Sequence, residues 1–146
     1  MLTLQQLESH LWGAADILRG KIDSSDYKHY IFGLLFFKRI CDVWEEEYEE
    51  RLAQYNDKAI AADPDEHRFH IPEGAFWKDV RKHTTNIGEH LNAAFHSIED
   101  ANSRLQGIFQ DVDFNNKERF PDATLELLLQ HFEKHRLRNI DVEPDM

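Results

Sequence analysis

This sequence of 146 residues contains nine histidines, and two pairs of them have a spacing found in metal sites. His131 and His135 stand four residues apart, which would place two metal ligands on one face of a helix. His67 and His70 form a second close pair. The zinc-protease motif needs a glutamate directly after the first histidine, and Phe132 occupies that position here. Partly exposed helix histidines explain the first pair better than zinc does, so we expect no metal.

Carboxylates are abundant, but their pattern is that of an exposed surface. The run from Glu45 to Glu50 holds five glutamates around one tyrosine. A general acid and base pair needs an apolar pocket that separates two pKa values. The six glycines never fall two apart, so no phosphate-cradling loop is indicated. We therefore expect no catalytic residue and no cofactor site in this chain.

Basic side chains gather where a first predicted helix ends and a long one begins. Lys28 and Arg39 are eleven residues apart, hence about 20° apart around a helix axis, so they could act together on DNA. Phe32 and Leu35 lie between them on the same side, which indicates a packed protein boundary. Ordinary surface charge is the alternative account of these bases, and the one that we favour. Trp12 is available either to the core or to a partner surface. The candidate contacts to DNA or to another subunit are Trp12, Arg19, Lys21, Lys28, Phe32, Leu35, Lys38 and Arg39.

The net charge of −11 limits any claim about nucleic acid. Residues 1–44 and 67–110 each carry five acids and five bases, whereas residues 45–66 carry nine acids and two bases and residues 111–146 nine and five. Taken whole, such a surface repels phosphate. Any DNA contact must therefore be local or made together with a partner.

One stretch, residues 24–56, organises the chain. Its apolar residues recur at spacings of four and three, which predicts one long helix with a continuous apolar stripe. Every residue from Tyr30 to Phe37 except Gly33 is large and apolar, so we expect that half to be buried on all sides. From Glu45 onward only the stripe stays apolar. This predicts that the second half of the helix has one solvent-exposed face and extends beyond the core. The stripe consists of Tyr30, Leu34, Phe37, Cys41, Trp44, Tyr48, Leu52 and Tyr55.

The ends of this helix and its environment are also predicted. Ser24 or Ser25 is expected to cap its start. The uninterrupted apolar run is eight residues, too short for a membrane span of about 20 residues. Cys41 is the only cysteine and lies on the stripe, so we expect a buried thiol and no disulfide. With no secretory signal at the N-terminus, a cytoplasmic location without membrane contact is the expectation.

A shorter helix should precede the long one. Thr3 and Gln6 have capping-box spacing, and Gly20 offers a stop. Residues 57–74 are expected to be a loop, and a short helix should start near Pro72 or Glu73. The apolar face of the first helix is expected to comprise Leu4, Leu7, Leu11, Ala14 or Ala15, and Leu18. The short helix should bury Phe76, Trp77 and Val80.

Two further helices complete the prediction. Asn86 with Glu89 should cap a helix that ends near Asn102, and Asp122 should cap another after Pro121. Their apolar faces are expected to hold Ile87, Leu91, Ala94, Phe95 and Ile98, and Leu125, Leu128, Leu129 and Phe132, respectively. With no strand predicted, we expect an all-α helical bundle organised around one long central helix, forming a single domain over residues 1–146.

Residues 11–42 resemble the N-terminal helical domain of the modification (methyltransferase) subunit of type I restriction-modification systems. The matching residues are Leu11, Trp12, Ala14, Ala15, Asp16, Leu18, Arg19, Gly20, Tyr27, Phe37, Lys38, Arg39, Ile40 and Asp42. Supporting likeness follows at Ile71, Pro72, Trp77, Leu91, Asn92, Ala93, Ala94, Ile98, Glu99, Asn102 and Leu105. The likeness covers nearly the whole chain.

The resemblance implies a helical domain that precedes a Rossmann-like catalytic domain, which transfers a methyl group from S-adenosylmethionine to N6 of adenine in a bipartite DNA site. The glycine motif and the N-P-P-[FY] motif of that catalytic domain have no counterpart in these residues. We therefore expect a fragment that holds no cofactor itself, with S-adenosylmethionine bound by the full-length protein. The acidic tail NIDVEPDM fits a cut just before the catalytic domain.

The resemblance also implies partners. Two modification subunits flank one specificity subunit, a restriction subunit joins the full complex, and the helical domains help to close the assembly around DNA. A different class of function is a free-standing acidic interaction module, such as a DNA mimic with Glu45 to Glu50 as its face. A third, an autonomous metal-dependent enzyme, depends only on the histidine spacing.

Overall fold

A computed structural model describes residues 1–142 of the chain. Within this range the backbone is all-α, as predicted, and the only β pairing is an isolated bridge between Leu2 and Val142. The α-helices are α1 (Leu4–Leu18), α2 (Tyr27–Tyr55), α3 (Lys58–Ala61), α4 (Trp77–Arg81), α5 (Ile87–Ala101) and α6 (Asp122–Phe132). Three 3-10 turns cover Ser24–Asp26, Pro64–Glu66 and Ser103–Leu105.

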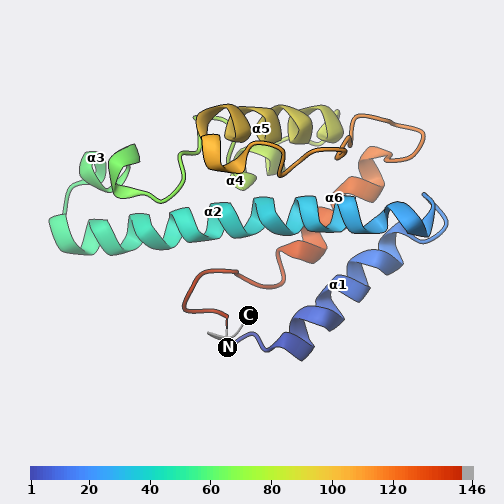
Figure 1. Cartoon of the computed structure of the whole chain (residues 1–146), viewed down its shortest axis with the longest axis horizontal. Helices are drawn as coiled ribbons and strands as arrows, with labels where there is room; N and C mark the ends of the chain where they lie inside the picture. The colour runs from blue at the N-terminus through green and yellow to red at the C-terminus, as the bar shows by residue number, and fades with distance from the viewer. Residues whose placement is uncertain (143–146) are drawn as a thin grey trace.

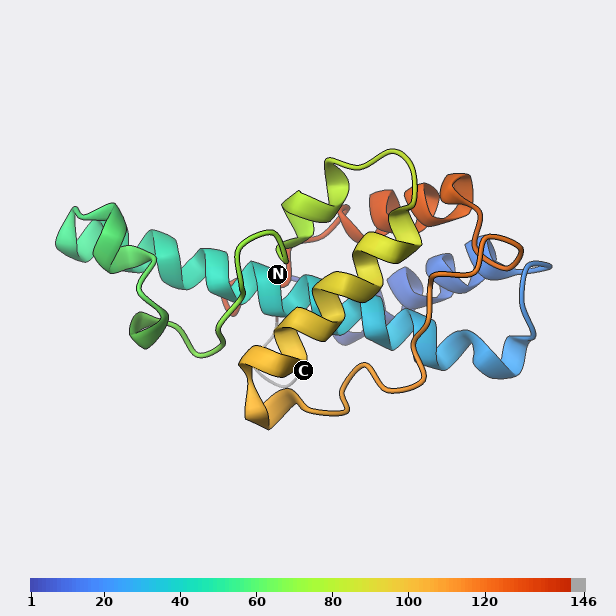
Figure 2. The same ribbon diagram turned by 90° about the horizontal axis from the view of Figure 1, so that it is seen from above.

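Helix α2 is the central element, as the sequence predicted. It has 29 residues and runs along the whole molecule, with α4 and α5 on one side and α1 on the other (Figure 1). Seen from above, α5 crosses over α2, while α1 and α6 lie near the first half of α2 (Figure 2). The second half of α2 extends beyond the bundle, where α3 folds back against it. None of the helices within residues 1–142 has the length and apolarity needed to cross a membrane.

The start of α2 differs from the prediction. The side chain of Asp23, not that of Ser24 or Ser25, accepts a hydrogen bond from the backbone N–H of Ser25 at 3.0 Å. This local side-chain bond closes a 3-10 turn before the α-helix begins at Tyr27.

Burial along α2 confirms the first half of the stripe and corrects one expectation. Phe37 is fully buried, and Tyr30, Leu34 and Cys41 are buried with it, whereas Tyr55 at the projecting end is exposed. The apolar half is not buried on all sides: Phe36 is 41% exposed, and Phe32 and Leu35 are half-buried. The other helices cover only part of its circumference, so one apolar strip of α2 faces outward.

Helix α1 begins with the predicted capping box. The hydroxyl of Thr3 accepts from the backbone N–H of Gln6, and Gln6 Oε1 accepts from Thr3 N at 2.9 Å. Gly20 follows the helix with a φ of +80°, a conformation that favours glycine. Leu4 was expected on the buried face but is 57% exposed. It lies in the first turn of α1, ahead of the buried positions His10, Ala14, Ala15 and Leu18.

The segment between α2 and α5 is more ordered than the predicted loop. The carboxylate of Asp57 accepts from the backbone N–H of Ala59 at 2.9 Å and starts the short helix α3. Helix α4 begins at Trp77 rather than near Pro72, and Trp77 and Val80 are buried as expected.

The starts of α5 and α6 are joined by a contact that the sequence did not predict. The carboxylate of Asp122 accepts from the backbone N–H groups of Ile87 at 3.0 Å and Asn86 at 3.2 Å. Asp122 thus caps α5 rather than its own helix, and Asn86, at φ 54°, makes no side-chain cap. The predicted apolar faces of both helices are buried.

The predicted histidine pair lies at the contact between α1 and α6, but the two are not on one helix, because α6 ends at Phe132 and His135 follows it. His131 stacks on His10 with ring centroids 4.4 Å apart, and His135 meets His10 edge-on at 4.8 Å. A ring nitrogen of His131 donates to the backbone oxygen of His10 at 2.6 Å. His67 of the second pair stacks on Trp44 and bonds the backbone oxygen of Ala61. Within residues 1–142 no group of three or more His, Cys, Asp or Glu side chains is arranged to hold a metal ion.

Helix α5 packs closely against the chain at Gly88. A Cβ built there would overlap the backbone carbonyl of Phe114. Glycine to alanine in an open helix position stabilises by about 1 kcal/mol, but overpacking costs about 1–3 kcal/mol. We expect Gly88→Ala to lower the free energy of unfolding by about 1–3 kcal/mol in urea titrations. The exposed control His96→Ala should change it by less than about 0.5 kcal/mol, and a stabilised Gly88→Ala would contradict the close packing.

His10 makes stability depend on pH. It is 5% exposed, its Nε2 has no hydrogen-bond partner within the described part of the chain, and burial, followed by the charges of His131 and His135, lowers its pKa from 6.5 to about 4. Below pH 6.5 the unfolded chain binds a proton that folded His10 does not, so stability falls as the pH drops towards 4.

Between about pH 7 and about pH 5 this group should cost about 2 kcal/mol of unfolding free energy. His10→Phe keeps an aromatic ring and removes the titration, so its loss over the same interval should be smaller by about that amount. His96→Gln, at an exposed position, should follow the wild type. Parallel pH profiles for wild type and His10→Phe would show that His10 is not the titrating group.

Candidate binding surface

The first half of α2 and the facing side of α1 enclose an apolar groove of about 700 Å³. We call it the α1–α2 groove. Trp12 of α1 is 70% exposed at its edge, and Phe32 of α2 forms part of its wall. Its lining residues are Glu8, Leu11, Trp12, Ala15, Arg19, Ser24, Tyr27, Lys28, Ile31 and Phe32. An exposed tryptophan beside an apolar hollow is typical of a surface that a partner covers.

Four of the eight predicted contact residues meet at this groove, namely Trp12, Arg19, Lys28 and Phe32. The arrangement follows from the chain reversal between α1 and α2, which places the end of one helix beside the start of the next. Two bases and one acid, Glu8, line the groove in a protein of net charge −11. With Asp16 paired to Arg19, the groove is an apolar hollow whose rim is close to neutral in charge.

The charged side chains around the α1–α2 groove are exposed to solvent. Arg19 pairs with Asp16 at 2.8 Å, and both side chains are mostly exposed. Lys21 and Lys28 are also exposed. Such exposed pairs contribute little to stability, so these side chains can turn to other partners at small cost.

Lys38 has a different place from the one the sequence suggested. It is 6% exposed, pairs with Asp42 four residues on, and lies over the ring of Trp77 with Nζ 5.9 Å from the ring centroid. This burial corrects the expectation that Lys38 is available to DNA or a partner. The Lys38–Asp42 spacing of four residues on one helix is the signal that could have indicated the pair.

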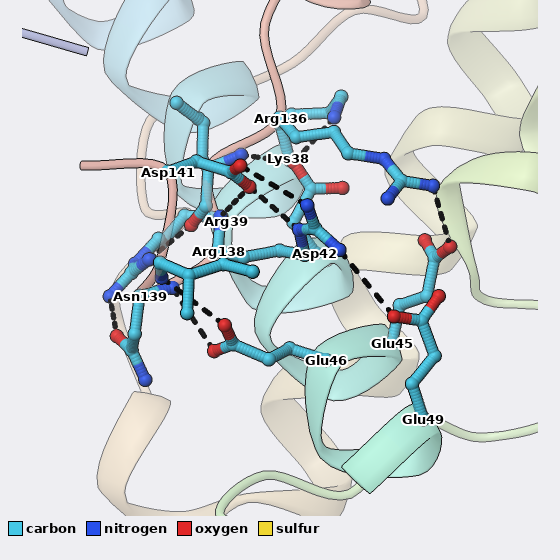
Figure 3. A network of polar contacts seen from close by, with 12 residues as sticks. Lys38, Arg39, Asp42, Glu45, Glu46, Glu49, Arg136, Arg138, Asn139 and Asp141 are labelled. Atoms are coloured by element: carbon cyan, nitrogen blue, oxygen red, sulfur yellow. Dashed lines mark hydrogen bonds and ion pairs between the residues drawn. The ribbon is translucent and has the colours of Figure 1, made fainter. Parts of the chain in front are cut away.

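Arg39 is also engaged inside the chain. Its guanidinium donates to the backbone oxygen of Leu137 and to Oδ1 of Asn139, in the segment after α6 (Figure 3). Burial lowers the pKa of Arg39, while the charges of Glu46 and Asp42 oppose that shift. Arg39 is thus held by Leu137 and Asn139, although it shares α2 with Lys28.

The remaining apolar candidates lie next to the groove. Leu35 is half-buried and packs against the core, and Phe32 stacks with Phe36 at a centroid distance of 6.2 Å. Phe36 is the contact candidate that the sequence argument missed, since it was counted among residues buried on all sides. Together, Trp12, Phe32 and Phe36 are apolar side chains exposed or half-exposed on this side of α1 and α2.

Cys41 has no chemical role at this surface. It is buried, and burial raises the pKa of its thiol to about 12. A thiol that stays protonated at neutral pH is a poor nucleophile and a poor metal ligand.

Comparison with known proteins agrees with this architecture. A crystal structure of the type I restriction-modification system methyltransferase subunit from Streptococcus thermophilus matches 89% of this chain and 34% of its own chain, with a TM-score of 0.67 and 22% sequence identity. At that identity the match shows a shared fold.

Sequence comparison gives the family. The methylase subunit of the type I restriction enzyme MjaIX from Methanocaldococcus jannaschii is 29% identical over 114 residues, which is 65% of this chain and 20% of that protein. This chain therefore spans only a small part of the length of these relatives. A family model described as the HsdM N-terminal domain matches residues 7–132, most of the chain, and the protein therefore belongs to the HsdM N-terminal domain family.

Proposed function

We propose that this domain serves subunit assembly and closure around DNA in a type I restriction-modification methylase that methylates adenine at N6. The observation that carries the proposal is the α1–α2 groove, an apolar hollow with the 70% exposed Trp12 at its edge. Large exposed aromatic side chains are enriched where protein partners bind. The family match supplies the class of complex in which such a surface would be used.

The partners of the proposed assembly are a specificity subunit, a second methylase subunit and, in the full complex, a restriction subunit. S-adenosylmethionine would be bound by the remainder of a full-length methylase subunit. This chain would position the catalytic part of the subunit against the specificity subunit and the DNA, and would supply no catalytic residue itself.

DNA contact in this proposal is local. The bases Arg19, Lys21 and Lys28 lie at one end of the molecule, whereas the acid excess of residues 45–66 lies on α2 and α3 at the projecting end. The second region repels phosphate, whereas the first is close to neutral, because Asp16, Asp23 and Asp26 lie among its three bases. The domain would therefore meet DNA only through the end that carries the groove.

An acidic DNA mimic is less well supported. Carboxylates of its supposed face are engaged by backbone groups: Glu46 is 5% exposed and accepts from Asn139 N at 3.1 Å and Ile140 N at 3.2 Å. Glu47 accepts hydrogen bonds from His67 and the backbone of Arg68. A mimic needs such groups free to face a basic partner.

The groove can be tested by pull-down with a specificity subunit. In a full-length methylase subunit, Trp12→Ala with Phe32→Ala should weaken association at least about tenfold, because interface aromatic residues commonly contribute about 2 kcal/mol or more. Leu127→Ala on α6, which removes another exposed apolar side chain, is the matched control and should bind normally. Equal binding by all three proteins, with unchanged melting curves, would rule the groove out as an assembly surface.

The local DNA contact has its own test. Lys21→Glu with Lys28→Glu should reduce the affinity of the assembled methylase for DNA and lower the slope of log K against log salt by about one to two. Lys82→Glu on the exposed end of α4 reverses charge elsewhere and should leave the slope unchanged. The measurement is fluorescence anisotropy over a salt series, and an unchanged slope in the double variant would argue that this end meets protein alone.

A further inference from the structure

The segment that follows α6 lies along α2 without helix or strand structure, from Arg136 to Asp141. We call it the strap. Its backbone N–H groups donate to carboxylates of α2: Leu137 N to Asp42 at 2.8 Å, and Asn139 N to Glu46 at 3.1 Å. Ile140 N donates to the second oxygen of Glu46 at 3.2 Å. Figure 3 shows these carboxylates pointing from α2 at the strap.

The carboxylates that hold the strap are buried. Asp42 is 6% exposed and Glu46 5%, and both point away from solvent into this contact. A buried carboxylate needs hydrogen-bond donors or an opposite charge. Lys38 supplies charge to Asp42, whereas both oxygens of Glu46 accept from strap backbone. Glu46 is therefore placed to hold the strap.

The carbonyl side of the strap is bound as well. Arg39 donates to the backbone oxygen of Leu137 and to the side chain of Asn139. Helix α2 thus provides carboxylates that accept from the backbone N–H groups of the strap, and an arginine that donates to its backbone carbonyl. Because these contacts involve backbone atoms, they fix the path of the chain rather than the identity of its side chains.

Contacts at the edges of the strap are weaker. Arg136 pairs with Glu45 on the surface, where exposed pairs contribute little. Arg138, whose side chain is 16% exposed, pairs with Asp141 of the strap at 2.7 Å and reaches the exposed Glu49 at 3.4 Å. The end of the strap is tied to the N-terminus, because Leu2 N donates to the backbone oxygen of Asp141 at 2.6 Å.

Apolar packing in this docking comes from one side chain of the strap. Leu137 is the buried apolar side chain of the strap, and it is not part of the main hydrophobic cluster of the bundle. Ile140 is 62% exposed. A segment held mainly by hydrogen bonds to a few side chains can leave its site without opening the core.

We propose that the strap is a docking element through which α2 sets the direction of the polypeptide that follows this domain in a longer methylase subunit, and that it undocks as a unit while the bundle stays folded. The solved relative contains about three times the length of chain, since this protein matches 34% of it. That extra chain is what the strap would orient. The existence of a following domain depends on the proposed function, whereas the docking of the strap on Glu46 does not.

Hydrogen exchange measured by mass spectrometry on this chain tests the docking. Glu46→Gln replaces one acceptor oxygen with an NH₂ group facing a backbone N–H, so one of two hydrogen bonds must be lost. Exchange in peptides covering residues 136–141 should rise about tenfold or more, because a hydrogen bond to a charged group is lost. Peptides from α5 should exchange as in the wild type. Asp42 is a poorer first target, since its removal would leave Lys38 buried without a partner.

Glu49→Gln is the matched control: it makes the same chemical change one turn further along α2, at a carboxylate that is 52% exposed and accepts from no backbone group of the strap. It should leave exchange in residues 136–141 unchanged. Equal exchange of the strap in wild type and Glu46→Gln would overturn docking by Glu46. Faster exchange of the strap and α5 together would also overturn the proposal, because the strap would then be part of the core.

Orientation is tested separately in a full-length subunit. Spin labels are placed at Lys82→Cys and at a surface cysteine introduced in the following domain, with native Cys41 buried and protonated. The distance distribution should be narrow with wild-type Glu46 and broader with Glu46→Gln. An unchanged width would overturn the orienting role. Absence of any following domain would contradict the proposed function and leave the exchange result standing.

Discussion

The carboxylate of Asp42 lies inside the bundle and accepts hydrogen bonds from Lys38 Nζ and from the backbone N–H of Leu137. A buried ion pair seldom adds net stability, but an unpaired buried charge costs several kcal/mol. The pair therefore constrains the fold more than it stabilises it: the same oxygen of Asp42 accepts from Lys38 and from Leu137 N, and so joins α2 to the segment after α6. Lys38 in turn lies over the ring of Trp77, so α2, the strap and α4 meet at this pair.

A second constraint is geometric. Helix α2 is longer than the bundle that surrounds it, so its ends have different environments. The first half carries more apolar residues than the other helices can cover, which leaves Phe36 and part of Phe32 outward beside the α1–α2 groove. The second half is acidic but satisfies much of its charge internally, through partners such as Arg136 and Arg138. The exposed apolar surface of the first half of α2, rather than the carboxylates of the second half, is thus the surface available to a partner.

Sequence periodicity predicted the helices and their faces well, because the buried positions of α5 and α6 depend on a spacing that the chain itself carries. It failed where the partner of a group is distant in sequence. Asp122 caps α5 from 35 residues away, and Arg39 binds Leu137 from 98 residues away, which no local rule anticipates. The rule that an all-apolar helix is buried on all sides failed at Phe36, because it holds only when enough other elements are present to cover the helix.

The predicted contact residues also fall into two groups, according to whether their partners are close in the sequence. Trp12, Arg19, Lys28 and Phe32 come together because a short connection forces α1 and α2 to be neighbours, which the sequence could predict. Lys38 and Arg39 are engaged by Asp42 and by Leu137 and Asn139, of which only Asp42 is close in sequence. Basic residues on one helix therefore have two roles in this domain. Those before Phe32 face outward beside the groove, whereas those after Phe36 hold the chain together, so the boundary between binding and structure lies within the apolar half of α2.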